Sequence, residues 1–362
     1  MFTNDSLILK KFYSNKNNEK FNNLNEIYEY FLKCLKNNLV KSKIINSFDT
    51  INVNDTNLNT NPYVTDDIKN EIKLLNKKTS GEINYGKTNI KINIFHKNTD
   101  KIGFFIYELI NIIHFLFSIY KNNKNIELNL YLSDKKKKLP ENITNGFIFG
   151  RDQANSGCCR RSNFINDTAV VDIWRKEEIL KVTVHELIHA LDIDYEINDT
   201  NDIINHYQNK YNISSNKINT NEAYTEILAN LINCFWISQK QGKNKLNFFQ
   251  KYLNLEKNHC LFQCSKIYEI SDLNQKKIDL NYETNILAYY LIRGEIYKNF
   301  ENFLSFLKNK NKDFLTINVN EWYELLRNNT KIENSDIIYK KENNDFTFKN
   351  TRMTCLELKV IN

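Results

Sequence analysis

Apolar and polar residues alternate with strand-like regularity in three segments of the chain. Residues 88–95 (TNIKINIF) and 126–133 (IELNLYLS) alternate with a period of two, and a third, shorter segment, TAVVDIW, occupies 168–174. Residues 102–120, between the first two segments, are apolar over nearly their whole length. They are expected to form a buried helix, so the pattern predicts strand, helix and strand in this order, with a further strand downstream.

Helical periodicity begins directly after the third strand. Residues 175–196 (RKEEILKVTVHELIHALDIDYE) open with acidic residues, which favour a helix start, and place apolar residues at helical spacing. A polar crossover of about 196–219 leads to a second helix over about 221–239, and mostly helical segments continue to Leu326. The mixture of strands and helices predicts an α+β fold for residues 88–327.

The two ends of the chain are more polar. Residues 1–87 are rich in Asn and Lys and contain one amphipathic stretch, 24–40, so they are expected to form a largely helical extension. Residues 328–362 are expected to form a polar, peripheral tail. The sequence therefore predicts three parts, with the central domain at 88–327.

Composition excludes several classes of protein. Hydrophobic residues make up 41% of the chain and aromatic residues 13%, too much apolar mass for a disordered protein. The net charge is +7 and nearly all the basic residues are Lys; the seven Arg are too few and too scattered for a dedicated nucleic-acid reader. Glu108, Asn111 and His114 interrupt the apolar segment 102–120, which favours a buried helix over a membrane span.

The cysteines and the N-terminal residues indicate a compartment. Seven Cys are an odd number without the spacing of a disulfide framework, and the first residues lack the long apolar stretch of a secretory signal. We therefore expect a protein of the reducing cytoplasm, without a membrane span.

The candidate chemistry lies in the sequence HELIH. His185, Glu186 and His189 match the H-E-x-x-H pattern, in which two imidazoles one helical turn apart bind a single zinc ion. The Glu then stands beside the metal-bound water and can take its proton as the water attacks a carbonyl. The alternative is a helix with two ordinary histidines and a surface glutamate.

A third ligand must come from another element, because two ligands on one helix cannot complete a tetrahedral site. Asp192 and Tyr195 stand where the metzincin pattern needs Gly and His, so that arrangement is excluded. The next helix contains TNEAYTEILANL, in which Glu222 and Glu226 lie one turn apart. Both carboxylates are therefore candidates.

HELIH followed by NEAYTE resembles the gluzincin metallopeptidases, which include thermolysin-like and anthrax-lethal-factor-like enzymes. The resemblance implies a zincin-like domain over 88–327, with Glu222 as the third zinc ligand and Glu226 as the acid that holds the imidazole of His185. Glu226 as the ligand is the alternative. Asp192, one turn beyond His189, is expected to orient that second imidazole or to be a solvated residue at the helix end.

A looser resemblance extends over about 155–293 and concerns metallopeptidase-like proteins of large cytoplasmic DNA viruses, so a viral protein of the host cytoplasm or the virion is expected. In the gluzincin group an edge strand before the active-site helix binds extended peptide through its backbone. Asn155, Ser156 and Gly157 are expected to form that substrate-binding rim, although NSG is also an ordinary turn sequence.

A hydrolase of this type also needs a hydrogen-bond donor for the oxyanion that develops on the attacked carbonyl. Tyr290 in the segment NILAYYLIRG is the first choice, together with its neighbour Tyr289. Tyr207 and Tyr211 are alternatives, because lethal-factor-like enzymes place such a Tyr upstream of the ligand Glu.

Two groups of cysteines suggest further ideas. His259, Cys260 and Cys264 could form a second metal site, but they lack a fourth partner nearby, and a buried helix face is the simpler interpretation. Cys158 and Cys159 lie beside the expected rim, where a thiolate could cap the zinc.

The sequence thus predicts a zinc metallopeptidase with one zinc ion, a peptide or protein as substrate, and Glu186 as general base. One alternative is a catalytically silent metal-binding or virion structural protein. Another is a zinc hydrolase that acts on a different amide or acyl bond.

Overall fold

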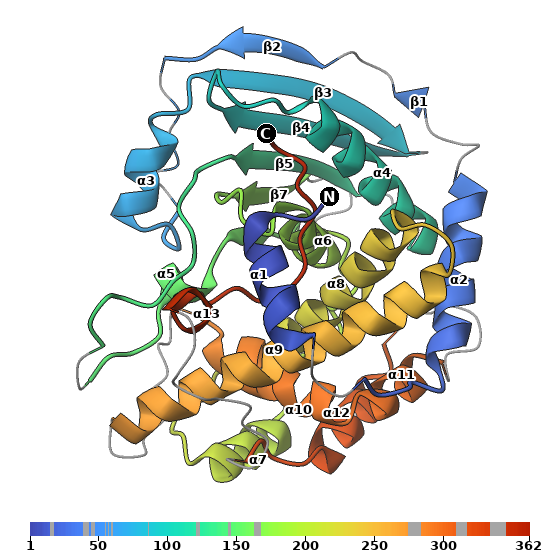
Figure 1. Ribbon diagram of the computed structural model, residues 1–362, viewed down its shortest axis with the longest axis vertical. Coiled ribbons are helices and arrows are strands. Elements are labelled where there is room, and N and C mark those ends of the chain that lie inside the picture. Colours follow the sequence, from blue (N-terminus) through green and yellow to red (C-terminus); the bar gives the residue numbers. More distant parts are fainter. Residues whose placement is uncertain are drawn as a thin grey trace. The chain divides into compact units, whose positions relative to one another are not determined.

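The structure is a computed structural model, shown as a ribbon in Figure 1. It describes the chain except for residues 15–17, 39–42, 45–47, 55, 57, 59–60, 86, 121–123, 144–145, 163–167, 274–283, 309–316 and 334–344. The described residues form two compact units, each assembled from separate stretches of chain. The sheet unit comprises Glu29–Lys136, Asn155–Ile193 and Lys359–Asn362. The helical unit comprises Met1–Tyr28, Lys137–Ala154 and Asp194–Leu358.

A seven-stranded sheet organises the sheet unit. Its strand order is β1-β3-β4-β5-β7-β6, and β2 also pairs with β3 (Figure 1). Parallel pairing joins β4, β5 and β7, whereas β1, β2, β3 and β6 pair antiparallel with their neighbours. The strands are β1 (Lys43–Ile44), β2 (Asp49–Asn52), β3 (Lys77–Tyr85), β4 (Thr88–His96), β5 (Asn125–Tyr131), β6 (Gly157–Arg160) and β7 (Thr168–Ile173).

The alternating segments of the sequence become the central strands of this sheet. Ile92 of β4 lies beside Leu128 of β5, and both are completely buried. Parallel pairing of β4 and β5 requires a crossover connection, which contains helix α4 (Gly103–Ile119). The apolar sequence of α4 buries most of the helix, which packs against α6 (Ile179–Ala190).

The helical unit is built on long helices with apolar surfaces. α8 (Thr220–Gln239) packs against α9 (Lys245–Leu273) and against the π-helix η1 (Leu287–Ile292), which continues into α10 (Arg293–Lys298). The other helices of this unit are α1 (Asn4–Tyr13), α5 (Arg151–Ala154), α7 (Asn201–Tyr211), α11 (Phe300–Lys308), α12 (Val319–Asn328) and α13 (Asp345–Lys349). α3 (Asp66–Ile72) belongs to the sheet unit, and α2 (Leu24–Asn38) contributes residues to both units.

The structure confirms the α+β class and the main predicted elements. The expected strands correspond to β4, β5 and β7, and the expected helices correspond to α2, α4, α6 and α8. Two segments without hydrophobic periodicity hold further short elements. α5 and β6 precede β7, and α7 lies in the polar crossover. In the described part of the chain, no helix is long and apolar enough to cross a membrane.

The predicted boundary between residues 87 and 88 falls inside a hairpin. β3 pairs antiparallel with β4 along its whole length, from Lys77 opposite His96 to Tyr85 opposite Thr88. The stretch expected to be a largely helical extension therefore contributes a full strand to the sheet. Its alternation was hidden in the sequence because two of the three positions that the sheet buries are Thr79 and Gly81, and only the third, Ile83, is a large apolar residue.

The expectation of a peripheral tail is wrong for residues 351–358, nearly all of which are buried. Arg352, Thr354 and Cys355 are 0% exposed. The carboxylate of Glu256 on α9 accepts hydrogen bonds from the backbone N–H groups of Cys355 and Leu356, at 2.9–3.0 Å, and from the Thr354 hydroxyl at 2.6 Å. Buried side chains satisfy this backbone, so a polar sequence can lie in the core.

Candidate metal centre

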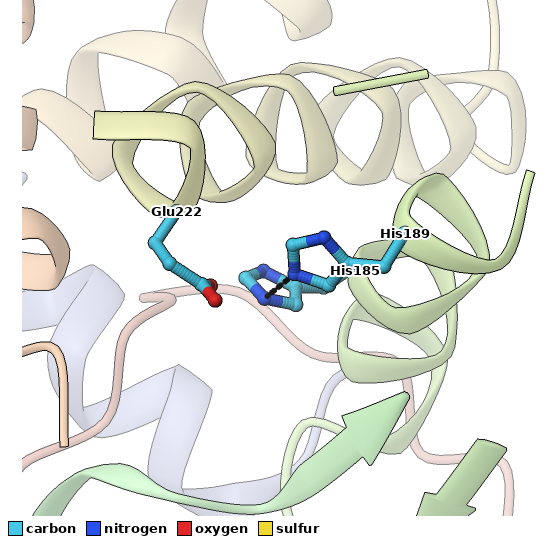
Figure 2. Close-up of side chains that lie close together, drawn as sticks. All are labelled: His185, His189 and Glu222. Atoms are coloured by element: carbon cyan, nitrogen blue, oxygen red, sulfur yellow. Dashed lines mark hydrogen bonds between the residues drawn. The ribbon is translucent and has the colours of Figure 1, made fainter. Parts of the chain in front are cut away.

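Helix α6 carries polar side chains in a buried position. His185, Glu186 and His189 are only 6%, 5% and 7% exposed. The two histidines lie one turn apart on the same face, and their Nε2 atoms are 3.2 Å apart (Figure 2). Ionisable side chains are seldom buried in a helix unless they are paired or bind a ligand, so these three residues indicate a candidate site.

Glu222 stands in the first turn of α8. One ligand atom from each of His185, His189 and Glu222 lies within 4.8 Å of the other two (Figure 2). Donor atoms bound to one zinc ion at about 2.1 Å lie no more than about 4 Å apart, which is close to this separation. Two imidazoles and one carboxylate also leave a fourth position for water, so the residues present fit a catalytic zinc site.

Polar contacts within the helical unit fix the start of α8. The backbone N–H of Thr220 donates to Asp199 Oδ2 at 3.1 Å, and the Thr220 hydroxyl donates to the other carboxylate oxygen. The side-chain amide of Asn221 donates to Asp194 at 3.2 Å. Because both anchoring residues precede Glu222 directly, the backbone that carries this carboxylate is held in place.

Tyr289, and not Tyr290, lies beside the third predicted ligand. The Tyr289 hydroxyl donates to Glu222 Oε2 at 3.1 Å. Tyr290 is 1% exposed, and its hydroxyl donates to the backbone oxygen of Thr351 at 2.9 Å. The two rings diverge because successive residues of a helix point in different directions, and here they lie on η1, a π-helix of the kind that often marks functional sites. The oxyanion role predicted for Tyr290 stays a prediction, but its hydroxyl is engaged with the Thr351 backbone, whereas that of Tyr289 lies beside Glu222.

The alternative donors Tyr207 and Tyr211 serve a different group. Tyr211 donates to Glu295 Oε1 at 2.6 Å, and Tyr207 donates to Oε2 at 3.3 Å. Lys210 forms an ion pair with the same carboxylate at 2.9 Å. Burial raises the pKa of Glu295 to about 7. Both tyrosine hydroxyls therefore stabilise a buried carboxyl group in the core of the helical unit.

Glu226 pairs with an arginine. Its Oε1 accepts a hydrogen bond from Arg293 Nη1 at 2.7 Å, and the two side chains are 1% and 0% exposed. The same Nη1 donates to the backbone oxygen of Met353 at 2.7 Å. The expected role of Glu226 in holding His185 stays a prediction. No sequence motif pointed to a role for Arg293, although its position four residues after Tyr289 places it one turn further along the same helix.

The residue expected to orient His189 is engaged with a lysine. Asp192 has φ 57° at the end of α6 and forms an ion pair with Lys124. Arg161 Nη2 lies 3.2 Å from His189 Nδ1 and can only donate there. The structure therefore places a cation against the outer nitrogen of this predicted ligand, and no sequence motif announced it.

The three predicted rim residues lie at the start of the edge strand β6, which contacts α6. The backbone oxygen of Asn155 accepts from Arg175 Nε at 3.1 Å, and that of Ser156 accepts from Trp174 N at 2.9 Å. Gly157 pairs with Ile173 of β7. The structure thus brings these residues to the edge of the sheet next to the helix that carries HELIH.

Cys158 on the same strand carries a neutral thiol when no metal is bound, and its expected capping of zinc stays a prediction. Burial and the neighbouring carboxylate of Glu186 raise the pKa of the Cys158 thiol to about 12. The side-chain amide of Asn61 donates to its sulfur at 2.9 Å. The neutral thiol is therefore the stable form. Asn61 lies in the N-terminal region, in which no sequence pattern pointed to a contact with this strand.

The second proposed metal cluster is part of the core. Tyr13 and the backbone oxygen of Arg352 contact the two ring nitrogens of His259, at 3.2 Å and 2.9 Å. Arg293 Nε donates to Cys260 Sγ at 3.2 Å, and the Cys264 thiol donates to the Tyr290 backbone oxygen at 3.0 Å. Within the described residues, the group of three that could hold a metal ion is the one formed by the two histidines of α6 and Glu222.

Comparisons with known proteins give one informative match. The chain is similar to an uncharacterized protein of Acanthamoeba polyphaga mimivirus, with 23% identity over 287 residues, which cover 77% of this chain and 71% of that protein. No family model matches the chain, and no solved structure matches it. The match therefore gives a relative in a large DNA virus but no activity.

Proposed function

We propose that the chain is a zinc-dependent peptidase of the gluzincin type, with zinc bound by His185, His189 and Glu222. The observation that carries the proposal is the proximity of these three ligand atoms, within 4.8 Å of one another, with both histidines on one face of α6 as HELIH predicts. Further support comes from the order of elements, since β7 leads into α6 and the edge strand β6 contacts that helix. A zincin-like catalytic domain has this order.

The proposed reaction is hydrolysis of a peptide bond. A bound zinc ion would lower the pKa of a coordinated water to about 7 and polarise the carbonyl under attack. Glu186 takes the proton from the attacking water and delivers it to the leaving amine. Tyr289 has a single hydroxyl proton, which it would turn from Glu222 to the oxyanion as that charge develops. An extended substrate lies along β6, whose outer edge can pair with another strand.

We further infer that the enzyme works in a reducing compartment. None of the seven cysteines, all of which lie in the described part of the chain, forms a disulfide, and those on α8 and α9 are buried. A viral origin is supported by the similarity to a mimivirus protein, so the host cytoplasm and the virion are the proposed locations.

The first test is the zinc content of the purified protein. We expect about one zinc per chain in the wild type after dialysis against a weak chelator, and loss of zinc in His189→Ala and Glu222→Ala. His206→Ala and Glu196→Ala are the matched controls, since neither residue is part of the metal group. Zinc retained by Glu222→Ala but lost from Glu226→Ala would move the third ligand to Glu226. Zinc absent from the wild type would refute the proposal.

The second test separates a peptidase from a silent metal-binding protein. Glu186→Gln should keep its zinc and lose hydrolysis, because the amide cannot accept the proton of the water. A digest of a peptide library followed by mass spectrometry detects internal and terminal cleavage. Zinc without cleavage by the wild type would favour a structural role, and cleavage of only non-peptide amide or acyl bonds would favour another zinc hydrolase.

A further inference from the structure

Gly157 lies against the side chain of Glu186. A Cβ atom placed on Gly157 would be 2.7 Å from Glu186 Oε1 and 2.9 Å from its Cγ. Nonbonded heavy atoms of folded proteins prefer separations of about 3.5–4.0 Å, so a side chain at position 157 and the observed Glu186 side chain exclude each other.

The backbone conformation does not explain this glycine. Gly157 is part of the strand β6 and has no positive φ angle, whereas Gly146 does. Any residue could adopt the backbone of Gly157, so the reason for a glycine there must be the space that its missing side chain leaves. That space is filled by the carboxylate of Glu186.

A larger residue at position 157 would displace the side chain of Glu186 before it disturbed the fold. The backbone of β6 is held by its ladder with β7, from Gly157 opposite Ile173 to Arg160 opposite Val170. The backbone of Glu186 is held inside the helix α6. The carboxylate end of Glu186 rotates about side-chain bonds, so it is the part of the contact that gives way most easily.

We propose that Gly157 is a positioning residue: its lack of a side chain lets the Glu186 carboxylate occupy the space beside β6. This inference rests on the proposed role of Glu186 as the general base. A displacement of about 1 Å in a catalytic group can reduce the rate about a hundredfold, so the identity of residue 157 would control turnover without touching the metal ligands.

The test compares four proteins with the wild type: Gly157→Ala, Glu186→Asp, the double variant, and Gly103→Ala. Gly103 belongs to the same unit, and a Cβ there would meet no described atom within 4 Å, so Gly103→Ala controls for the added methyl group. Glu186→Asp shortens the side chain and makes room for the alanine. Each protein is unfolded with denaturant in its metal-free form, titrated with zinc, and assayed for kcat and KM on fluorescently labelled casein.

Three results are expected. In the metal-free proteins, Gly157→Ala and Glu186→Asp are coupled. The equilibrium constant for unfolding of the double variant is roughly tenfold smaller than the sum of the two separate effects on the free energy predicts. Gly157→Ala binds zinc as tightly as Gly103→Ala does. Its kcat on casein falls roughly a hundredfold while KM stays the same, and Glu186→Asp recovers part of that loss in the Gly157→Ala background.

The possible failures are distinguishable. Independent, additive effects on unfolding would refute the contact, and an unchanged kcat in Gly157→Ala would refute the positioning role. A parallel loss of zinc binding would also overturn it, because the substitution would then act on the ligands. If the variants show coupled unfolding but the wild-type protein binds zinc and cleaves nothing, the contact stands and the proposed peptidase is refuted. The contact would then have no catalytic meaning.

Discussion

Among the single residues, Arg161 determines which ring nitrogen of the predicted ligand His189 carries the proton in this arrangement. Its guanidinium donates to His189 Nδ1 at 3.2 Å, so in this arrangement the proton of a neutral ring must be on Nε2, the nitrogen that faces His185. A zinc ion bound at Nε2 requires the proton on Nδ1, where a carbonyl or carboxylate normally accepts it. Arginine has no acceptor, so it must move away when metal binds.

Replacing Arg161 by glutamine should therefore strengthen zinc binding. The glutamine carbonyl can accept the proton of Nδ1, so the ligand is stabilised in the state that binds metal. Changes to such partners alter metal affinity about 10–100-fold, and we expect a gain of about tenfold. Competition with a chromophoric chelator measures the affinity. Arg160→Gln is the control, because that neighbouring side chain is 71% exposed. Weaker zinc binding by Arg161→Gln would contradict the argument.

How far the candidate site could be predicted differs from residue to residue. The two histidines of HELIH follow from sequence because a helix fixes the relation of residues four apart. The choice between Tyr289 and Tyr290 could not be made, because it depends on the phase of η1, a π-helix that no periodicity in the sequence announces. Arg161, directly after β6, lies 28 positions before His189 in the sequence, and spacing cannot reveal their contact.

At the scale of helices and segments, Arg293 links two neighbours of the candidate site within the helical unit. Its Nη1 donates both to Glu226, one turn after Glu222 on α8, and to the backbone oxygen of Met353 in the C-terminal segment. All these groups are buried, so the arginine holds α8, the start of α10 and the C-terminal segment together. The ion pair is costly to break because either partner alone would be a buried charge.

Arg293→Met should destabilise the protein strongly. The methionine fills much of the same volume but leaves the Glu226 carboxylate without its guanidinium, and loss of one partner of a buried pair costs about 3–5 kcal/mol. Denaturant unfolding measures the loss. The double variant Arg293→Met/Glu226→Gln should recover a large part of it, because the stranded charge is removed. A single variant as stable as the wild type would show that the pair contributes nothing.

Elements with a clear period were predictable, and elements defined by contacts were not. β4, α4 and α6 follow from alternation or apolar runs in their own sequences. The buried segment 351–358 has no period, because it is held by side chains such as Glu256, about a hundred positions away in sequence. β6 has only four residues, too few to show any period.

The whole molecule consists of two units whose chain segments alternate along the sequence. The chain changes unit at positions 28/29, 136/137, 154/155, 193/194 and 358/359, and the first of these lies inside α2. Hydrophobic periodicity tells which face of an element is buried but not which partner buries it. The sequence therefore predicted three consecutive parts, and it could not show that each unit is made of segments that alternate along the chain.

Two buried carboxyl groups make the stability of the helical unit depend on pH. Burial raises the pKa of Glu256 and the pKa of Glu295, each to about 7, well above the usual value of 4.5. Between these values the unfolded chain releases protons that the folded chain retains. The free energy of unfolding contributed by each group is therefore complete below about pH 4.5 and is lost as the pH rises through 7.

Glu256→Gln should flatten this dependence. A neutral amide has no proton to lose, so the fall in the free energy of unfolding between pH 5 and pH 8, up to about 3 kcal/mol for each carboxyl, should shrink by the share of Glu256. Urea unfolding at a series of pH values, with EDTA present so that metal binding does not contribute, measures this change.

Glu321→Gln is the control, since that side chain is exposed on α12. Because Glu295 still titrates in Glu256→Gln, part of the fall must remain and disappear only when both residues are replaced. A wild-type protein whose stability rises from pH 5 to pH 8 would contradict the argument, because its buried carboxyl groups would then be bound more favourably as anions.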